Sequence, residues 1–224
     1  MRAGHQRGRS KLDPPSYSLH GQVLLITDTT KYLGLSLTSD LKWNTHIQKV
    51  SAKANSILGL LRRNLRIASK PVKTMAYEAL VRPHLEYACT VWDPHTQVNI
   101  KRLDMVQRRA ARYVCNRWHN TSSVSDMFSE LGWESLASRR LKASLCMMYK
   151  TVHGLAGITW QEYKMQSSRC TRGPHPWKYT PILPHSDAYT FSFLPCTIIV
   201  WNALPPDIVS CPSLESFRAG LLTM

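Results

Sequence analysis

The stretch Thr74–Trp92, TMAYEALVRPHLEYACTVW, decides how the rest of the chain is expected to fold. It is apolar on nearly every side of a helix, and a helix of that kind is normally buried among other helices. Pro83 lies in its middle, where a proline removes a backbone donor and collides with the preceding turn, so we expect a kink or interruption there. The stretch predicts a small helical bundle, with itself at the centre and the arginines outside.

Two amphipathic segments flank this stretch. The first begins near Thr45, where Thr45 and Gln48 fit a capping box, and the second runs from about Val98 to Arg117. Their apolar stripes are Ile47, Val50, Ala54, Ile57, Leu58, Leu61 and Leu65 in the first, and Leu103, Val106, Ala110, Tyr113 and Val114 in the second. The sides away from these stripes carry Arg62, Arg63 and Arg66 in the first, and Lys101, Arg102, Arg108, Arg109 and Arg112 in the second.

The remaining segments predict a mainly α fold with a short β-hairpin ahead of the bundle. Tyr17–Ile26 and Lys31–Leu37 are aliphatic and aromatic runs, and the polar residues 27–30 between them indicate one hairpin. Residues 124–131 and 134–154 have the pattern of two further helices, with Leu136, Leu141, Leu145, Met148 and Val152 inside the second.

The end of the chain is rich in proline, and we expect it to be irregular. A short strand is predicted at Phe191–Phe193 or Thr197–Trp201, and a final helix at Leu214–Leu222. The predicted organisation is a disordered basic N-terminus (1–16), a hairpin and linker (17–43), a helical bundle (44–118), a helical C-terminal region (119–157) and an irregular Pro-rich tail (158–224).

Positive charge is concentrated in one part of the chain. The 224 residues have a formal net charge of +15, and residues 31–118 hold sixteen Lys and Arg against five Asp and Glu. A concentrated basic field of this kind favours a polyanionic partner, most often nucleic acid. The alternative is a basic surface that serves solubility alone.

Composition also suggests where the protein works. The six cysteines are widely spaced, with no CxxC pair and no Cys/His cluster at zinc spacing, which is typical of a reducing setting. The first residues contain no apolar signal region, and the longest uncharged run, 188–206, is interrupted by prolines. We expect an intracellular protein, nuclear or cytoplasmic, without a membrane partner.

No constellation of side chains in the sequence indicates a complete enzyme. His84 and Glu86 form half of a zinc-deaminase signature without the cysteines that complete it, and Asp93 with His95 offers two metal ligands without a third. Carboxylates are few and scattered, so there is no natural pair for two-metal or acid–base chemistry. We therefore expect no catalytic residue, no metal site and no cofactor in this chain.

An ordered series of motifs resembles one known family. KYLGL (31–35), LKWNTHI (41–47), LVRPHLEYACTVWDPH (80–95), LDMVQRRAARYV (103–114) and WNALPPDIVSCPSLESFRAGL (201–221) are similar to the sequence that follows the catalytic core in non-LTR (LINE-type) retrotransposon reverse transcriptases. The Jockey and chicken-repeat branches are the most similar. The resemblance extends from Tyr17 to the end of the chain, and the series of motifs together is its specific feature.

The resemblance implies a fold and a partner. The family's RNA-directed DNA polymerases have fingers, palm and thumb, and residues 17–43 correspond to the last palm hairpin, 44–118 to the thumb and 119–224 to the C-terminal region. The family's catalytic aspartates, which bind Mg²⁺ in the complete polymerase, lie upstream of KYLG. The expected function is therefore that of a truncated reverse transcriptase fragment that binds the primer–template backbone, an RNA–DNA or DNA duplex, without catalysis.

The residues expected to contact nucleic acid follow from their charge and their place in the thumb. They are Lys31, Tyr32, Gly34, Arg62, Arg63, Arg66, Lys70, Lys73, Arg108, Arg109 and Arg112. Binding through phosphates carries no sequence information, so it should be tolerant of sequence. For the hairpin around Tyr32 the alternative is a packing edge for the missing palm. For the whole chain the alternatives are a protein-interaction module, with the missing palm and fingers or another protein as partner, and a remnant reading frame.

Overall fold

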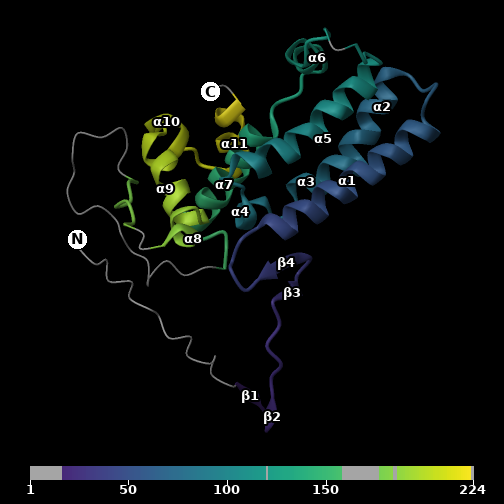
Figure 1. Cartoon of the computed structure of the whole chain (residues 1–224). Coiled ribbons are helices and arrows are strands. Elements are labelled where there is room, and N and C mark those ends of the chain that lie inside the picture. Colours follow the sequence, from purple (N-terminus) through teal and green to yellow (C-terminus); the bar gives the residue numbers. More distant parts are fainter. Residues whose placement is uncertain (1–16, 120, 158–176, 184–185, 223–224) are drawn as a thin grey trace, which may run out of the picture.

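The computed structural model describes residues 17–119, 121–157, 177–183 and 186–222, and in these ranges the chain is mainly helical (Figure 1). The predicted class of fold, mainly α with short β structure at the start, is confirmed. The disorder predicted for residues 1–16 lies outside the described residues, and so does the part of the Pro-rich tail from 158 to 176.

Two separate hairpins precede the helices, where one was predicted. They pair antiparallel strands β1 (Ser18–Leu19) with β2 (Gln22–Val23), and β3 (Thr29–Tyr32) with β4 (Leu35–Thr38). Each turn consists of two residues with positive φ, His20 (50°) and Gly21 (78°) in the first and Leu33 (45°) and Gly34 (85°) in the second. Such two-residue turns match the twist of paired strands. The single hairpin was wrong because each apolar run contains its own X-Gly turn.

The first bundle consists of three helical segments. They are α1 (Asn44–Asn64), a middle segment made of α2 (Lys70–Ala76), the π-helix η1 (Tyr77–Val81), α3 (Arg82–Glu86) and α4 (Cys89–Trp92), and lastly α5 (Gln97–Cys115). Helices α1 and α5 run parallel, because Asn99 Nδ2 donates to Asn44 Oδ1 (2.6 Å) at their starts and the Tyr113 hydroxyl donates to the Leu61 carbonyl (3.2 Å) near their ends. The middle segment returns antiparallel to both.

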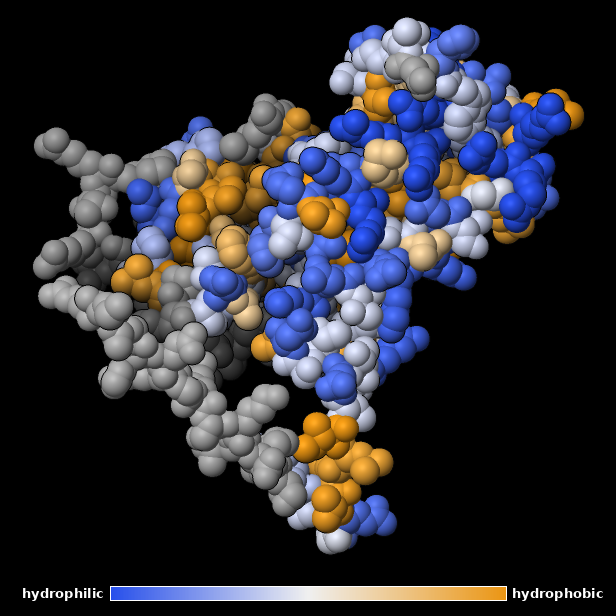
Figure 2. Space-filling view, in the orientation of Figure 1, coloured by the Kyte–Doolittle hydropathy of each residue, from blue (hydrophilic) through white to orange (hydrophobic). Residues whose placement is uncertain are grey.

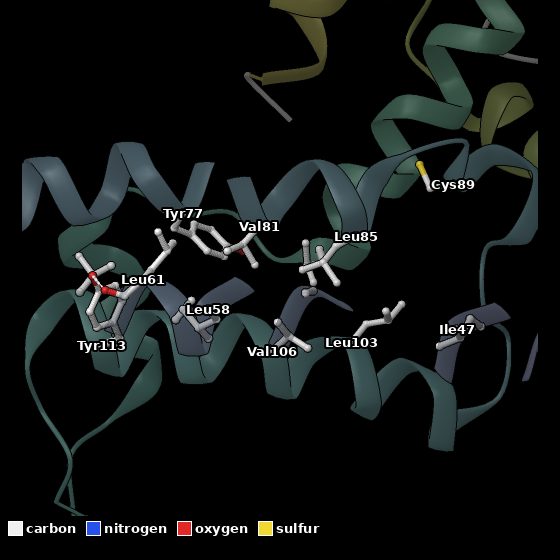
Figure 3. Close-up of a cluster of buried hydrophobic side chains, with 14 of the residues drawn as sticks. Ile47, Leu58, Leu61, Tyr77, Val81, Leu85, Cys89, Leu103, Val106 and Tyr113 are labelled. Carbon is white, nitrogen blue, oxygen red and sulfur yellow. Dashed lines mark hydrogen bonds between the residues drawn. The ribbon is translucent and has the colours of Figure 1, made fainter. Parts of the chain in front are cut away.

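The apolar stripes of α1 and α5 form the first core, as predicted. Figure 3 shows side chains of the three segments meeting in a row between the ribbons. Fully or largely buried members include Ile47, Ala54, Leu58, Leu61, Tyr77, Val81, Leu85, Trp92, Leu103, Val106, Ala110 and Val114. Each buried Leu, Ile or Val among them contributes about 1.5–3 kcal/mol. The predicted capping box is wrong, because α1 begins at Asn44 and its cap position, Trp43, makes no side-chain cap.

The buried residues of the middle segment recur every four positions. Lys73, Tyr77, Val81, Leu85 and Cys89 are all buried. In a regular α-helix of 3.6 residues per turn, four residues overshoot one turn by about 40°, so this spacing would drift around the helix. The wider turn of η1 and the left-handed Ala88 (φ 51°) lie within the segment and interrupt that regular winding. Pro83 lies directly after η1, in the first turn of α3, so the predicted interruption occurs at this point.

The middle segment is covered on one face only. Met75, Leu80, Tyr87 and Val91 are exposed, so the expectation of a helix buried on all sides was wrong. A bundle of three segments has no further layer to cover the outer side of its middle member, and those apolar side chains therefore face solvent.

Helix α6 (Val124–Leu131) and helix α7 (Leu136–Val152) confirm the two helices predicted there. Leu136 belongs to the first core, whereas Leu145, Met148 and Tyr149 belong to a second core. Leu141, predicted to lie inside, is exposed. Helix α7 therefore joins two separate clusters of buried side chains.

The second core lies between the last part of α7 and the final helices, which are α8 (Asp187–Thr190), α9 (Phe193–Ala203), α10 (Pro206–Val209) and α11 (Leu214–Leu222). The prediction of α11 is confirmed, but the strand predicted at 191–193 or 197–201 was wrong. Four consecutive β-branched residues, 197–200, favour a strand by local propensity. Packing of Ile198 and Trp201 in the second core overrides that preference, and Pro195 is tolerated in the first turn of α9.

Candidate nucleic-acid interface

A hollow of about 550 Å³ lies where the ends of α1 and α5 meet the start of the middle segment. We call it the basic hollow. Its lining consists of Gly59, Arg62, Arg63, Arg66, Lys73, Tyr113, Asn116 and Trp118, which include four cations and no carboxylate. Hydrophilic surface gathers over this end of the bundle, the end farthest from β1 and β2 (Figure 2). The three predicted arginines of α1 and Lys73 are therefore brought together in one place.

Lys73 is the most unusual member of the basic hollow, because it is only 8% exposed. Its Nζ atom lies 5.3 Å from the centre of the Tyr113 ring, so the aromatic face supplies part of its environment. None of the ion pairs between described residues involves Lys73. A buried cation without a carboxylate leaves a demand for negative charge that a ligand entering the hollow would meet.

Trp118 forms part of the lining and was not predicted from the sequence. The Arg62 guanidinium lies 4.5 Å from the centre of its ring, and the residue is 46% exposed. Trp118 follows the left-handed Asn116, which ends α5. The only sequence signal is a tryptophan immediately after a basic helix, at a position where no core stripe continues.

Two of the arginines at this end also stabilise helix α1. Arg62 and Arg63 lie in the last turn of α1, where cations interact favourably with the negative end of the helix dipole. The Tyr113 hydroxyl donates to the carbonyls of Leu61 (3.2 Å) and Leu65 (3.4 Å) beside them. Burial raises the pKa of Tyr113, which keeps this hydroxyl a donor. These contacts account for the position of the arginines but leave their charge unneutralised.

Lys70 differs from the other predicted cations, because it already has a carboxylate partner. Glu130 of α6 accepts a hydrogen bond from Lys70 and also pairs with Arg117 at 3.0 Å. The hydrogen bond from Lys70 lowers the pKa of Glu130, so this carboxyl is ionised at neutral pH. Lys70 does not line the basic hollow. The structure therefore sets it apart from the four unpaired cations.

The three predicted arginines of α5 flank the basic hollow without lining it. Arg108 is exposed, and Arg109 donates to the Oδ1 atom of Asn55 on α1 at 3.1 Å. Arg112 is half-buried, and its Nε atom has no hydrogen-bond partner among the described residues. We call the hollow and these three arginines of α5, the helix that supplies Tyr113 to the hollow, the basic face.

Lys31, Tyr32 and Gly34 lie far from this face, at the opposite end of α1 (Figure 1). Helix α1 has 21 residues and so spans about 30 Å. The β3–β4 turn packs on the bundle instead: the Tyr87 hydroxyl donates to the Leu33 carbonyl at 3.1 Å, and a Cβ on Gly34 would lie 3.4 Å from the Tyr87 ring. The structure does not bring these three residues together with the arginines.

The residues considered for metal chemistry have other contacts. Asp93 accepts from Arg140 Nε at 2.6 Å, and the His95 ring stacks on Phe191 with centroids 4.0 Å apart. Among the described residues there is no group of three or more His, Cys, Asp or Glu side chains placed to hold a metal ion. Five cysteines in the described ranges are free thiols, and Cys170 lies outside them. No helix in these ranges has the length and apolar character needed to cross a membrane.

Comparison with protein-family models, with curated proteins and with solved structures finds no match to this chain. What its basic end can do must therefore be inferred from the arrangement itself. Cationic side chains without carboxylate partners can bind phosphate oxygens, and the described residues of this end offer no nucleophile paired with a base.

Proposed function

We propose that this chain binds the sugar–phosphate backbone of a nucleic-acid duplex through its basic face. The observation that carries the proposal is the basic hollow, in which four cations, one of them the buried Lys73, converge without a carboxylate. Arg108, Arg109 and Arg112 add three cations on α5. Contacts of this kind are made to phosphates and so should be tolerant of sequence.

The resemblance to non-LTR reverse transcriptases supports the same proposal. A polymerase thumb holds a primer–template duplex by its phosphates, and the parallel α1 and α5 supply the cations of the segment that the resemblance assigns to the thumb. An RNA–DNA hybrid is accordingly the first duplex to test. The proposal includes binding and not polymerisation, and Mg²⁺ would belong to the complete polymerase only.

The test is fluorescence anisotropy of the chain with labelled RNA–DNA and DNA duplexes over a salt series. Seven unpaired cations on the basic face predict a slope of log K against log salt of about −6, at about 0.9 per neutralised phosphate. Two duplexes of unrelated sequence should give the same curve. A flat salt dependence, or binding that differs strongly between sequences, would contradict the proposal.

Charge-removing variants locate the interface. Replacing Arg108, Arg109 and Arg112 together by Gln should reduce the slope by about 3 and weaken binding strongly at low salt. The matched control is Lys178→Gln, which removes a cation from the part of the chain beside the second core. If only net charge mattered, this single-charge control would reduce the slope by about 1, one third of the effect of the trio variant, and that outcome would remove the basic face as the interface.

Self-association is a second candidate function, and the first hairpin favours it. Leu25 is 90% exposed, and Tyr17, Leu19, Val23 and Ile26 are also exposed. Figure 2 shows them as an apolar group at the bottom of the molecule, away from both cores. Among the described residues neither edge of this two-stranded hairpin pairs with a further strand, and a second copy would pair with one of them.

Sedimentation at low and high salt tests this second candidate. A dimer that persists at high salt and is lost in Leu25→Ser would support it, since apolar contacts are not screened. A monomer at all concentrations would exclude it.

A further inference from the structure

We propose that the basic hollow holds a terminal phosphate of a nucleic-acid strand, in preference to a phosphodiester within the strand. This inference rests on the proposed nucleic-acid binding and names the part of the nucleic acid that the hollow takes. It follows from the charge of the hollow, from its shape and from the residue at its rim.

Charge is the first observation. Arg62, Arg63, Arg66 and Lys73 bring four positive charges to one hollow, and none of the lining residues is acidic. A phosphodiester carries one negative charge, whereas a phosphomonoester carries about −1.5 to −2 at neutral pH and has three acceptor oxygens. The terminal group therefore matches the charge and the donors of this hollow better than an internal one does.

Shape is the second observation. Lys73, which is 8% exposed, lies on the lining of a partly open concavity of about 550 Å³, with side chains of α1, α2 and α5 around it. An internal phosphate has a sugar on each side, and the strand must enter and leave. A terminal phosphate is attached on one side only, so it can enter the hollow more deeply and contact more of its four cations than a phosphate within a strand can.

The rim supplies a contact for the nucleotide that carries the phosphate. Trp118 is 46% exposed and lines the same hollow, with the Arg62 guanidinium beside its ring. Exposed aromatic rings next to cations are typical of sites that stack an unpaired base. The hollow thus combines a phosphate site with an adjacent stacking surface, which suits a frayed or single-stranded end.

The experiment compares oligonucleotides that differ only in their ends. Single strands labelled at the 3′ end are titrated into the full chain with a 5′-phosphate or with a 5′-hydroxyl, and the reverse pair tests the 3′ end. The phosphorylated strand should bind about tenfold more tightly at one of the two ends. Pyrophosphate should compete with that strand more effectively than with its hydroxyl counterpart.

Two variants assign the effect to the hollow. Lys73→Met keeps the length and apolar stem of the side chain and should abolish the preference for the phosphorylated end. Arg108→Gln, outside the hollow, should weaken both strands equally and leave their ratio unchanged. If a melting curve shows that Lys73→Met is unfolded, Arg66→Gln at the exposed side of the hollow takes its place, with the same expectation.

The outcomes separate this inference from the proposed function. Equal binding of phosphorylated and hydroxyl strands, at both ends, would overturn the terminal-phosphate site and leave backbone binding intact. A preference that survives in both Lys73→Met and Arg66→Gln would also overturn it. Absence of binding to every strand and duplex would overturn both.

Discussion

The two cores of this protein lie under very different surfaces. Residues 31–118, which build most of the first core, contain sixteen Lys and Arg against five Asp and Glu, whereas residues 177–222, which build most of the second, contain two against three. Both cores are closed by the same kinds of aliphatic and aromatic side chains. The demands of burial are therefore alike in the two regions, so burial does not explain the excess of cations at the first.

The second region uses its polar groups for internal contacts. The Asn202 side chain exchanges two hydrogen bonds with the backbone of Tyr179, at 3.0 and 2.7 Å, and the Tyr149 hydroxyl donates to the Cys211 carbonyl at 2.7 Å. Among the described residues, the four cations that line the basic hollow have no such internal partner of opposite charge. In the second region these polar groups are paired inside the structure, whereas the lining of the basic hollow places no carboxylate beside its cations.

The largest expected effect concerns the independence of the second core. Ile198→Ala should lower the free energy of unfolding by about 2–5 kcal/mol, because Ile198 is 2% exposed and its truncation leaves a cavity. Hydrogen exchange should show the loss of protection in α9 and α11, with α1 and α5 little affected. Ile199→Ala is the matched control. Ile199 is 64% exposed, so this substitution should change the free energy of unfolding by less than about 0.5 kcal/mol. Uniform loss of protection along the chain would mean that the two cores unfold as one.

The next effect concerns the joint between the regions. Arg140 of α7 is buried and pairs with Asp93, which follows α4. Asp93→Ala should lower the free energy of unfolding in urea by about 1–3 kcal/mol, because it leaves the buried Arg140 guanidinium without its partner. The Asp93 carboxylate is half-exposed, so solvent screens the pair and the loss should lie near the lower value. Arg140→Met removes the charge together with its need for a partner and should cost less. A larger loss in Arg140→Met would indicate that packing of this side chain matters more than its charge.

A smaller effect tests whether binding belongs to one region. Arg63→Gln, at the basic hollow, should reduce the salt slope by about 1 and weaken duplex binding severalfold. Arg218→Gln, on the exposed side of α11, removes the same charge from the second region and should leave both quantities unchanged. Equal effects would erase the functional difference between the two surfaces.

The smallest expected effect is a dependence of the free energy of unfolding on pH, and the histidine of the first region should contribute more to it than that of the second. His46 is buried and its Nδ1 atom accepts from the Ser36 amide at 3.3 Å; burial, and then the charge of Lys49, lower its pKa below 6.5. A depressed pKa means that the unfolded chain binds the proton more readily. The stability contributed by neutral His46 is therefore complete above about pH 6.5 and is lost as the pH falls below that value.

His46→Asn keeps an acceptor near the Ser36 amide and should flatten the loss of stability between pH 7 and pH 5, measured as the urea midpoint at each pH. His153 of the second region also has a pKa lowered by burial, but its side chain is exposed, so His153→Asn should change the curve less. A larger change in His153→Asn would reverse this comparison.

Much of the helical structure could be predicted from apolar periodicity. The stripe from Ile47 to Leu65 and the stripe from Leu103 to Val114 are long enough for the period to be unambiguous, and both proved to be buried. The short helices and strands were harder to predict from the sequence. Helix α9 has a local preference for a strand that only its packing on α7 overrides, and the two hairpins depend on single glycine-containing turns.

The candidate site could be predicted in its charges but not in its geometry. Arg62, Arg63 and Arg66 were identified because they lie opposite an apolar stripe, which is a local pattern. Tertiary contacts decide the remaining features: they bury Lys73, and they pair Lys70 with Glu130, which lies sixty residues further along the chain. Trp118 was missed for the same reason, since nothing in the sequence around it says that it meets Arg62.

The π-helix η1 keeps Lys73 on the buried face of the middle segment. Twelve residues separate Lys73 from Leu85, and regular winding at about 100° per residue would leave the two side chains about 120° apart around the helix axis. The wider turn of η1 takes up one residue, and eleven regular steps end within about 20° of three full turns. Deleting one residue from Tyr77–Val81 should therefore remove the π-turn and leave Lys73 at the basic hollow. Replacing the wide turn by regular winding without a deletion would instead turn Lys73 away from it.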